Sequence, residues 1–274
     1  MEKHITRRNF LTGSAVLVTG TLLGPARSIV AQQAPASAGP LSPALMEDLI
    51  AGNRILANYG VVDAFGHLTV RHDKNPNHFF MARSLAPALV TPDDVIEYDL
   101  DARGVNVRGR GEYSERFIHA EIYRARPDVH SVVHAHSPSV VPFTVTNVPL
   151  RPIYHMGAFI GEGLNTYEIR KAAGMTDMLV KDVARGRALA QSLGDKPAVL
   201  MRGHGVAVVG PTIIFAVGRA IYLELNARVQ LQAMSMGSPI TYLDPKEAQA
   251  VLDSGENRGY ERAWELWKKQ AMGK

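Results

Sequence analysis

The segment that most constrains the fold runs from Val129 to His136. Val129–Val133 is an alternating apolar run, typical of a β-strand, and it ends in His134-Ala135-His136. Residues two apart on a strand point to the same face, so both imidazoles can bind one metal ion without bending the backbone. A helix would instead need ligands four residues apart. The pattern therefore predicts a rigid sheet element that presents two metal ligands.

A third imidazole comes from a separate part of the chain. The short apolar runs Ala198–Met201 and Val206–Val209 predict a hairpin, with the glycine-flanked His204 at its turn. Glu115, nineteen residues before His134, adds a carboxylate. Three histidines and a carboxylate suit zinc or another borderline divalent metal, and a displaceable fourth ligand is typical of a catalytic site. The alternatives are hydrogen-bonded core histidines and, for Glu115, a solvated carboxylate near a helix start.

Length and charge narrow the class of protein. The chain has 274 residues, of which 46% are hydrophobic, enough for one large domain. Its net charge of +4 comes largely from residues 1–31, since the remainder holds 26 of the 30 basic and 25 of the 26 acidic residues. No basic cluster with interleaved aromatic residues remains, so we expect no nucleic-acid partner. The lack of cysteine excludes disulfides and thiolate ligands.

Residues 1–31 resemble a bacterial twin-arginine export signal. The pair Arg7-Arg8 precedes a diluted apolar stretch, Leu11–Leu23, and then small residues up to Ala31. The stretch is too short and too weakly hydrophobic for a membrane span. We therefore expect a periplasmic or secreted protein, cleaved near Ala31 and without a stable membrane span afterwards. An uncleaved anchor, or a tail on a cytoplasmic protein, is the alternative.

The remaining chain is expected to consist of a linker at 32–43, a metal-dependent domain at 44–240 and a helical extension at 241–274. Folded structure is expected to begin at Ser42 or Pro43. Alternating strand and helix patterns predict an α/β layered domain. Helices are expected at Leu45–Tyr59, Glu115–Arg126, Met175–Ser192, Ile213–Met236 and Pro245–Lys269, and further strands at Phe65–His72, Phe79–Met81, Val95–Leu100 and Leu150–Tyr154.

With these residues placed, the chain resembles the class II aldolase/adducin family over about residues 44–240. Ser114-Glu115, the nineteen-residue spacing to His134 and the hairpin histidine carry the resemblance. It implies an α/β/α sandwich around a mainly antiparallel sheet, assembled as a homotetramer with sites at subunit interfaces. It further implies that His134, His136 and His204 bind a divalent metal, usually zinc, with manganese, cobalt or iron as alternatives. Glu115 is implied to be both a metal-proximal ligand and an acid/base.

Departures from the sugar-phosphate aldolases narrow the expected substrate. Gly66-His67-Leu68-Thr69 stands where those enzymes have a phosphate-binding Gly-Asn-Xaa-Ser element, and Arg83-Ser84 replaces a Thr-Gly element. We therefore do not expect the enzyme to bind its substrate through a phosphate group. The chain is more similar to a branch of hydroxy-carboxylate decarboxylases that act on carboxylated ring-cleavage products and hydroxypyridine dicarboxylates. This similarity is carried by Ala64–His67, Met81–Ser84, Tyr154–Met156 and Met201–Gly205.

The resemblance and the residues together predict a divalent-metal-dependent lyase that cleaves a C–C bond through a metal-stabilised enolate. Decarboxylation of a small hydroxy or oxo carboxylic acid is the favoured reaction. Glu115 is expected to protonate the carbanion, which calls for a raised carboxyl pKa. The alternatives are a class II aldolase acting on a hydroxy-carbonyl substrate and a non-catalytic, adducin-like interaction protein.

Five further residues complete the expected site. His67 and His155 are expected to orient a substrate hydroxyl or relay a proton, with a hydrogen-bonded interior histidine as the alternative for each. Arg83 is expected to bind a substrate carboxylate through a bidentate contact, with a surface ion pair as its alternative. Ser84 and Ser114 are expected to bind substrate beside it.

Overall fold

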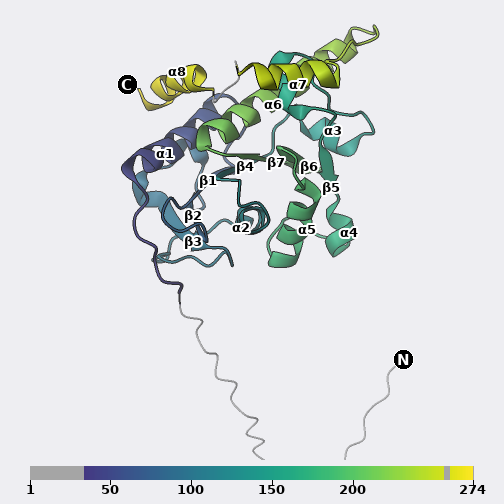
Figure 1. Cartoon of the computed structure of the whole chain (residues 1–274). Helices are drawn as coiled ribbons and strands as arrows, with labels where there is room; N and C mark the ends of the chain where they lie inside the picture. Colours follow the sequence, from purple (N-terminus) through teal and green to yellow (C-terminus); the bar gives the residue numbers. More distant parts are fainter. Residues whose placement is uncertain (1–33, 256–259, 274) are drawn as a thin grey trace, which may run out of the picture. The chain divides into compact units, whose positions relative to one another are not determined.

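The computed structural model describes residues 34–255 and 260–273 (Figure 1), so the predicted export signal lies outside the described residues. A seven-stranded sheet of order β3-β2-β1-β4-β7-β6-β5 forms the centre of the unit beginning at Ala34. Every neighbouring pair is antiparallel except β5 and β6. The strands are β1 (His67–Arg71), β2 (His78–Ala82), β3 (Val95–Asp99), β4 (Ser131–Ala135), β5 (Asn165–Tyr167), β6 (Ala198–Met201) and β7 (Gly205–Gly210).

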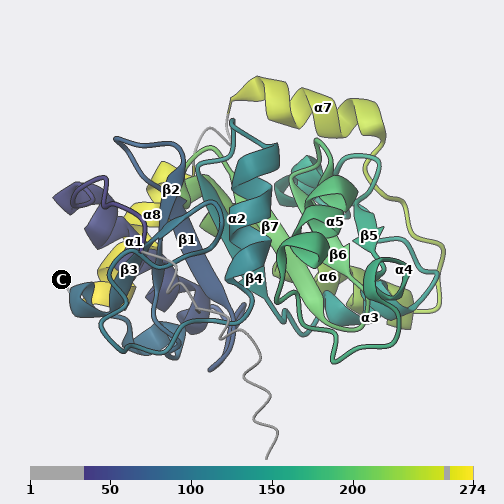
Figure 2. The same cartoon turned by 90° about the horizontal axis from the view of Figure 1, so that it is seen from below.

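Helices cover both faces of this sheet, which confirms the predicted α/β/α sandwich. α1 (Pro43–Asn58) and α6 (Ile213–Ser235) pack on one face, and α2 (Arg116–Ala125) and α5 (Val183–Leu193) on the other. Figure 2 views the second face, with α2 and α5 in front of the strands. The shorter elements are α3 (Val141–Val145), α4 (Ile169–Ala173), α7 (Pro245–Ser254), α8 (Glu261–Met272), η1 (Pro87–Leu89), η2 (Pro92–Asp94) and η3 (His155–Ile160).

Side-chain alternation along β4 decides which face carries the histidines. Val133 and Ala135 belong to the core beneath α1 and α6, whereas Val132 belongs to the core beneath α2 and α5. His134 is two residues after Val132 on the strand, so its side chain points to the same face, toward α2. It lies opposite His67 on β1 and is fully buried in the middle of the sheet.

The predicted strand at Leu150–Tyr154 is wrong. This segment has no regular secondary structure, and its backbone is satisfied by α6 instead of by a neighbouring strand. Arg151 donates its N–H to the side chain of Gln230, and Ile153 donates to Asn226, each at 3.0 Å. Buried helix amides thus take the place of a strand ladder.

Two helix boundaries also differ from the predicted ones. α5 begins at Val183 rather than Met175, because Asp182 caps it by accepting the N–H of Arg185. The predicted helix at Pro245–Lys269 is two helices, the first ending at Ser254 before a left-handed Gly255.

Ordered contacts begin before the helix that starts at Pro43. Ser37 Oγ donates to one carboxylate oxygen of Glu97 at 2.6 Å, and the N–H of Ala38 donates to the other at 2.8 Å. Leu41 is buried in the core. The amino-acid composition of the predicted linker thus indicated that residues 34–42 form no helix or strand, but it did not predict these contacts.

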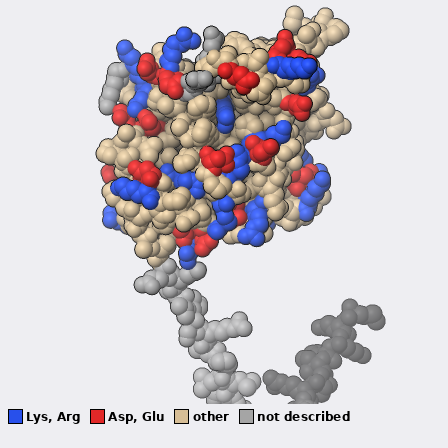
Figure 3. Space-filling model, in the orientation of Figure 1, with Lys and Arg blue, Asp and Glu red and all other residues tan. Residues whose placement is uncertain are grey.

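Lys and Arg side chains are interspersed with Asp and Glu side chains over the face seen in Figure 3. Within residues 34–255 and 260–273, no helix is both long and apolar enough to span a bilayer.

Arg71 joins the end of α2 to the sheet, and its loss is expected to be strongly destabilising. The side chain is buried and donates to four backbone carbonyl groups, those of Pro76, Tyr123, Arg126 and Val129. Arg71→Met leaves these carbonyls without a donor, so we expect a loss of about 3 kcal/mol or more in the free energy of unfolding, measured by urea titration. Arg103→Met, which removes a half-exposed ion pair with Asp99, is the control and should leave the free energy of unfolding nearly unchanged. Equal losses in the two variants would contradict this account.

Candidate metal and substrate site

Four side chains from three separate parts of the chain converge on one point. Single ligand atoms from Glu115, His134, His136 and His204 all lie within 4.8 Å of one another. His134 comes from β4, His136 follows that strand, His204 lies in the β6–β7 turn and Glu115 precedes α2. The Nε2 atoms of His136 and His204 are 3.1 Å apart, and Oε2 of Glu115 is 3.5 Å from Nε2 of both His134 and His204.

The donor atoms of this cluster fit a metal ion. His134 Nδ1 lies 3.1 Å from the carbonyl of Val206 and donates to it, which leaves the lone pair on Nε2. That Nε2 is buried and has no hydrogen-bond partner within the described residues. Burial, together with the neighbouring His134 and His204, lowers the pKa of His136 to about 4, so its ring is neutral at pH 7. Neutral imidazoles beside a carboxylate are the ligands that zinc and similar ions take.

Glu115 is ionised in this arrangement. Burial by itself raises the pKa of its carboxyl, but contacts with His134 and His204 outweigh burial and hold the pKa well below its usual range. The direction is opposite to the one expected for an acid in a closed site. Its other oxygen accepts the N–H of Val180 at 2.9 Å, which fixes the carboxylate in place. Glu115 is the N-cap residue of α2, but its side chain makes no cap hydrogen bond.

Glycines shape the turn that carries His204. Gly203 has φ +62°, a left-handed conformation that favours glycine, and its N–H donates to the buried Thr144 Oγ1 at 2.9 Å. A Cβ added at Gly205 would lie 2.1 Å from the carbonyl oxygen of Ala135. The two glycines thus let this turn approach the end of β4 closely enough for the histidines to meet.

A cavity of about 490 Å³ opens beside the cluster. His67, Ser84 and Ser114 line it, as three of the residues predicted to contact substrate. Its apolar wall includes Phe65, which is 65% exposed and stacks on His136 with ring centroids 6.5 Å apart. The other lining residues are Ala64, Gly66, Leu85, Ala86, Glu112, Tyr113, Glu115, His134 and Leu179.

Arg83 lies beside this cavity without being part of its lining. Its Nε is 2.6 Å from Oδ1 of Asp94, the ion pair that was the alternative interpretation. Arg83 directly precedes the lining residue Ser84; burial raises the pKa of Tyr113, another lining residue, and the hydrogen bond with Leu85 and then the positive charge of Arg83 oppose that rise. Neither Nη group makes a hydrogen bond within the described residues. Asp94 therefore orients Arg83 through Nε and leaves both Nη groups free to bind another partner.

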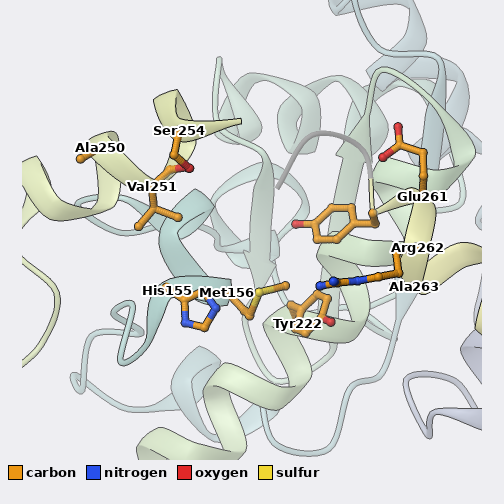
Figure 4. A pocket seen from close by; sticks show the side chains of 10 residues that line it. His155, Met156, Tyr222, Ala250, Val251, Ser254, Glu261, Arg262 and Ala263 are labelled. Carbon is orange, nitrogen blue, oxygen red and sulfur yellow. The ribbon is translucent and has the colours of Figure 1, made fainter. Parts of the chain in front are cut away.

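His155 lies away from the other predicted site residues. It begins η3, which packs against α6 and α7, and it lines a different cavity of about 830 Å³ with Met156, Tyr222 and Arg262. Figure 4 shows these side chains around that cavity. Within one chain, the structure does not bring His155 to the histidine cluster, because η3 packs against α6, on the sheet face opposite the one toward which His134 points.

His119, a further histidine beside the cavity, was not among the predicted site residues. It is fully buried on α2, and its Nε2 lies 2.7 Å from Nδ1 of His67. Burial, then the neighbouring His119 and His134, holds the pKa of His67 well below its usual range. Its spacing from Glu115 could have identified His119 as a site residue, because His119 lies four residues after Glu115 and therefore on the same helical face.

The fold and this donor cluster define an α/β/α sandwich with a candidate metal site on one face of its sheet. Residues 47–231 match the model of the class II aldolase and adducin N-terminal domain, and the chain belongs to this family. Decarboxylase tropJ of Talaromyces stipitatus is 38% identical over 240 residues, covering 80% of this chain and 90% of that protein. A 3,4-dihydroxyphthalate decarboxylase of Arthrobacter keyseri is 32% identical, covering 82% and 93%. These relatives support an enzyme of the lyase class.

Solved structures agree with this fold. An L-fuculose 1-phosphate aldolase from Glaciozyma antarctica superposes with a TM-score of 0.65 at 26% identity, covering 83% of this chain and 86% of that one. An aldolase II superfamily protein from Pseudomonas syringae gives 0.72 at 21% identity, covering 85% and 94%. The predicted family and fold are therefore confirmed.

Proposed function

We propose that this chain is a divalent-metal-dependent lyase that decarboxylates a hydroxy or oxo carboxylic acid. The observation that carries the proposal is the convergence of His134, His136 and His204 on Glu115, with a buried imidazole nitrogen left without a partner. The names of the two decarboxylase relatives support the choice of reaction. We favour zinc, and manganese, cobalt or iron are the other ions that this donor set accepts.

A divalent ion bound there would polarise the substrate oxygen next to the breaking C–C bond and stabilise the negative charge that develops. The bond to the carboxylate breaks, CO₂ leaves, and its electron pair stays on the substrate carbon, which then takes a proton. Glu115 is the group placed to deliver it. Because Glu115 is ionised, that proton must first reach it from the substrate hydroxyl or from water.

The cavity walls indicate how the substrate is held. We propose that the free Nη groups of Arg83 bind the substrate carboxylate, with Ser84 and Ser114 beside them. Phe65 offers a flat apolar surface next to His136, which suits a planar substrate. For this reason 3,4-dihydroxyphthalate, the compound in the name of one relative, is a suitable first probe.

Removing both predicted substrate contacts tests this assignment. The double variant Arg83→Met/His67→Leu is expected to lower kcat/KM for CO₂ release by about 100-fold or more, because both side-chain donors to the substrate are lost. Its metal content should equal that of the parent. Arg103→Met/His130→Leu, which changes the same residue types at exposed or half-exposed positions, is the control. Parental turnover by the Arg83/His67 variant would refute the assignment.

The aldolase alternative is supported by the fuculose-phosphate aldolase fold and the same donor cluster. It predicts release of an aldehyde from an unphosphorylated hydroxy-carbonyl compound, with no CO₂. The interaction-protein alternative rests on human beta-adducin, which is 22% identical over 80% of this chain and 30% of adducin. It predicts no metal and no turnover.

We also propose that residues 1–31 direct export to the periplasm and that the mature chain assembles as a homotetramer. Arg7→Lys/Arg8→Lys is expected to abolish export, as followed by cell fractionation, because the paired arginines are the distinguishing element of this signal. Arg27→Lys, in the same segment, is the control and should be exported normally. Light scattering of the purified protein gives the mass of the assembly. Export of the double variant at the parental level would show that the segment is not such a signal.

A further inference from the structure

A buried chain of hydrogen bonds lies directly behind the substrate cavity. His67 Nδ1 is 2.7 Å from His119 Nε2, and His119 Nδ1 is 2.8 Å from Thr69 Oγ1. Thr69 Oγ1 is in turn 2.8 Å from the hydroxyl of Tyr123. These side chains come from β1 and α2, and each is at most 4% exposed. The chain begins at the cavity, where His67 is part of the lining, and ends inside the protein.

The inner end of the chain fixes where its protons lie. Burial raises the pKa of Tyr123, so its phenol is protonated, and Thr69 Oγ1 is the hydrogen-bond acceptor that the described residues provide for it. A threonine hydroxyl has a single proton. With Thr69 accepting from Tyr123, its proton goes to His119 Nδ1 at 2.8 Å rather than to the carbonyl of Val132 at 3.5 Å.

The remaining hydrogen bonds then follow in order. His119 accepts at Nδ1, so its single proton is on Nε2 and is donated to His67 Nδ1. His67 accepts at Nδ1, so its own proton is on Nε2. That nitrogen makes no hydrogen bond to any described residue and belongs to a ring that lines the cavity.

We propose that His119 is a positioning residue that holds His67 as its Nε2–H tautomer, so that His67 presents a hydrogen-bond donor to the cavity. His67 then binds an oxygen of the substrate and does not act as a base. This inference rests on the proposed function only in taking the cavity as the substrate site. In this proposal, the hydrogen bonds that run from Tyr123 through Thr69 and His119 all serve to orient the ring of His67.

The tautomer is measurable without substrate or activity. In full-length, zinc-loaded protein labelled with ¹⁵N-histidine, long-range ¹H–¹⁵N correlation spectra distinguish the two neutral imidazole forms, and His67→Gln and His119→Gln assign the signals. We expect the Nε2–H form at both rings. Finding His67 as the Nδ1–H form would overturn the proposal.

Substitutions in the buried chain of hydrogen bonds test what sets the tautomers of His119 and His67. Thr69→Val keeps the shape of the side chain but removes the hydroxyl, so we expect loss of the Nε2–H preference at His119 and His67. Ser131→Ala is the matched control: it removes a buried hydroxyl that donates to the backbone of Thr69 and leaves the chain intact. If Thr69→Val does not fold, Tyr123→Phe removes the first donor and should weaken the same preference. Unchanged tautomers in the folded variant would also overturn the proposal.

Activity provides a second readout. His119→Phe cannot donate to His67, whereas the amide of His119→Gln can, so we expect kcat/KM for 3,4-dihydroxyphthalate to fall about tenfold or more in the first and to be largely restored in the second. Metal content should be unchanged in both. Equal losses in the two variants would reject a positioning role. If the parent enzyme itself releases no CO₂, the proposed function fails while the spectroscopic result still decides this inference.

Discussion

Replacing His134 and His136 together with alanine is expected to abolish metal binding. Elemental analysis should find one divalent ion per chain in the parent and none in the variant, because the end of β4 supplies two of the three imidazoles. His204 and Glu115 alone cannot complete a tetrahedral site. Decarboxylation should fall by about 1,000-fold or more, since the metal supplies several kcal/mol of charge stabilisation.

His130 provides the matched control for this experiment. It lies before the same strand but is exposed, so His130→Ala should keep both the ion and the activity. If the parent chain contains no metal after incubation with zinc and manganese, the enzyme proposal fails and the interaction-protein alternative gains support. If the double alanine variant retains the ion, the cluster is not the metal site.

Glu115→Gln is expected to have the second largest effect. The substitution keeps the size of the side chain and an oxygen that can accept the N–H of Val180, but it removes the group that moves the proton. We expect kcat to fall by about 100- to 10,000-fold, the usual range for loss of a positioned acid or base. Three imidazoles remain, so most of the metal should stay bound.

The control for this change is a carboxylate on α2, the helix that Glu115 precedes. Glu121 is 2% exposed and pairs with Arg124 and Arg187, so Glu121→Gln tests the effect of removing a buried charge away from the metal ligands. It should lower stability but leave kcat within about threefold of the parent, as no transition-state contact is lost. A parental kcat in Glu115→Gln would assign the proton transfer to another group.

Local periodicity was sufficient to predict the sheet elements that carry the ligands. The strand ending in His134 and the hairpin around His204 depend on period-two patterns and glycine positions, which are short-range properties. Leu150–Tyr154 has an apolar composition as well, but buried amides of α6 satisfy its backbone. Such a side-chain contact between distant segments leaves no local pattern.

The site chemistry was harder to predict than the site residues. The direction of the shift in the Glu115 pKa depends on two distances of 3.5 Å, to His134 on β4 and to His204 in the β6–β7 turn, which no spacing in the sequence reports. The contact of His119 with His67 requires α2 to lie across β1, again a long-range arrangement. The pairing of Arg83 with Asp94 is closer in sequence but needs the turn at η2.

The central place of β4 has a consequence for the newly made chain. β4 is bounded by β1, from the early part of the sequence, and by β7, which ends only at Gly210. The ligand residues therefore come together only after the ribosome has released the chain beyond that point, because loop closure must precede these pairings. Uptake of the proposed metal would thus be a late event in biogenesis that follows completion of the sheet, and in a product truncated before β7 the turn that carries His204 would no longer be held beside β4.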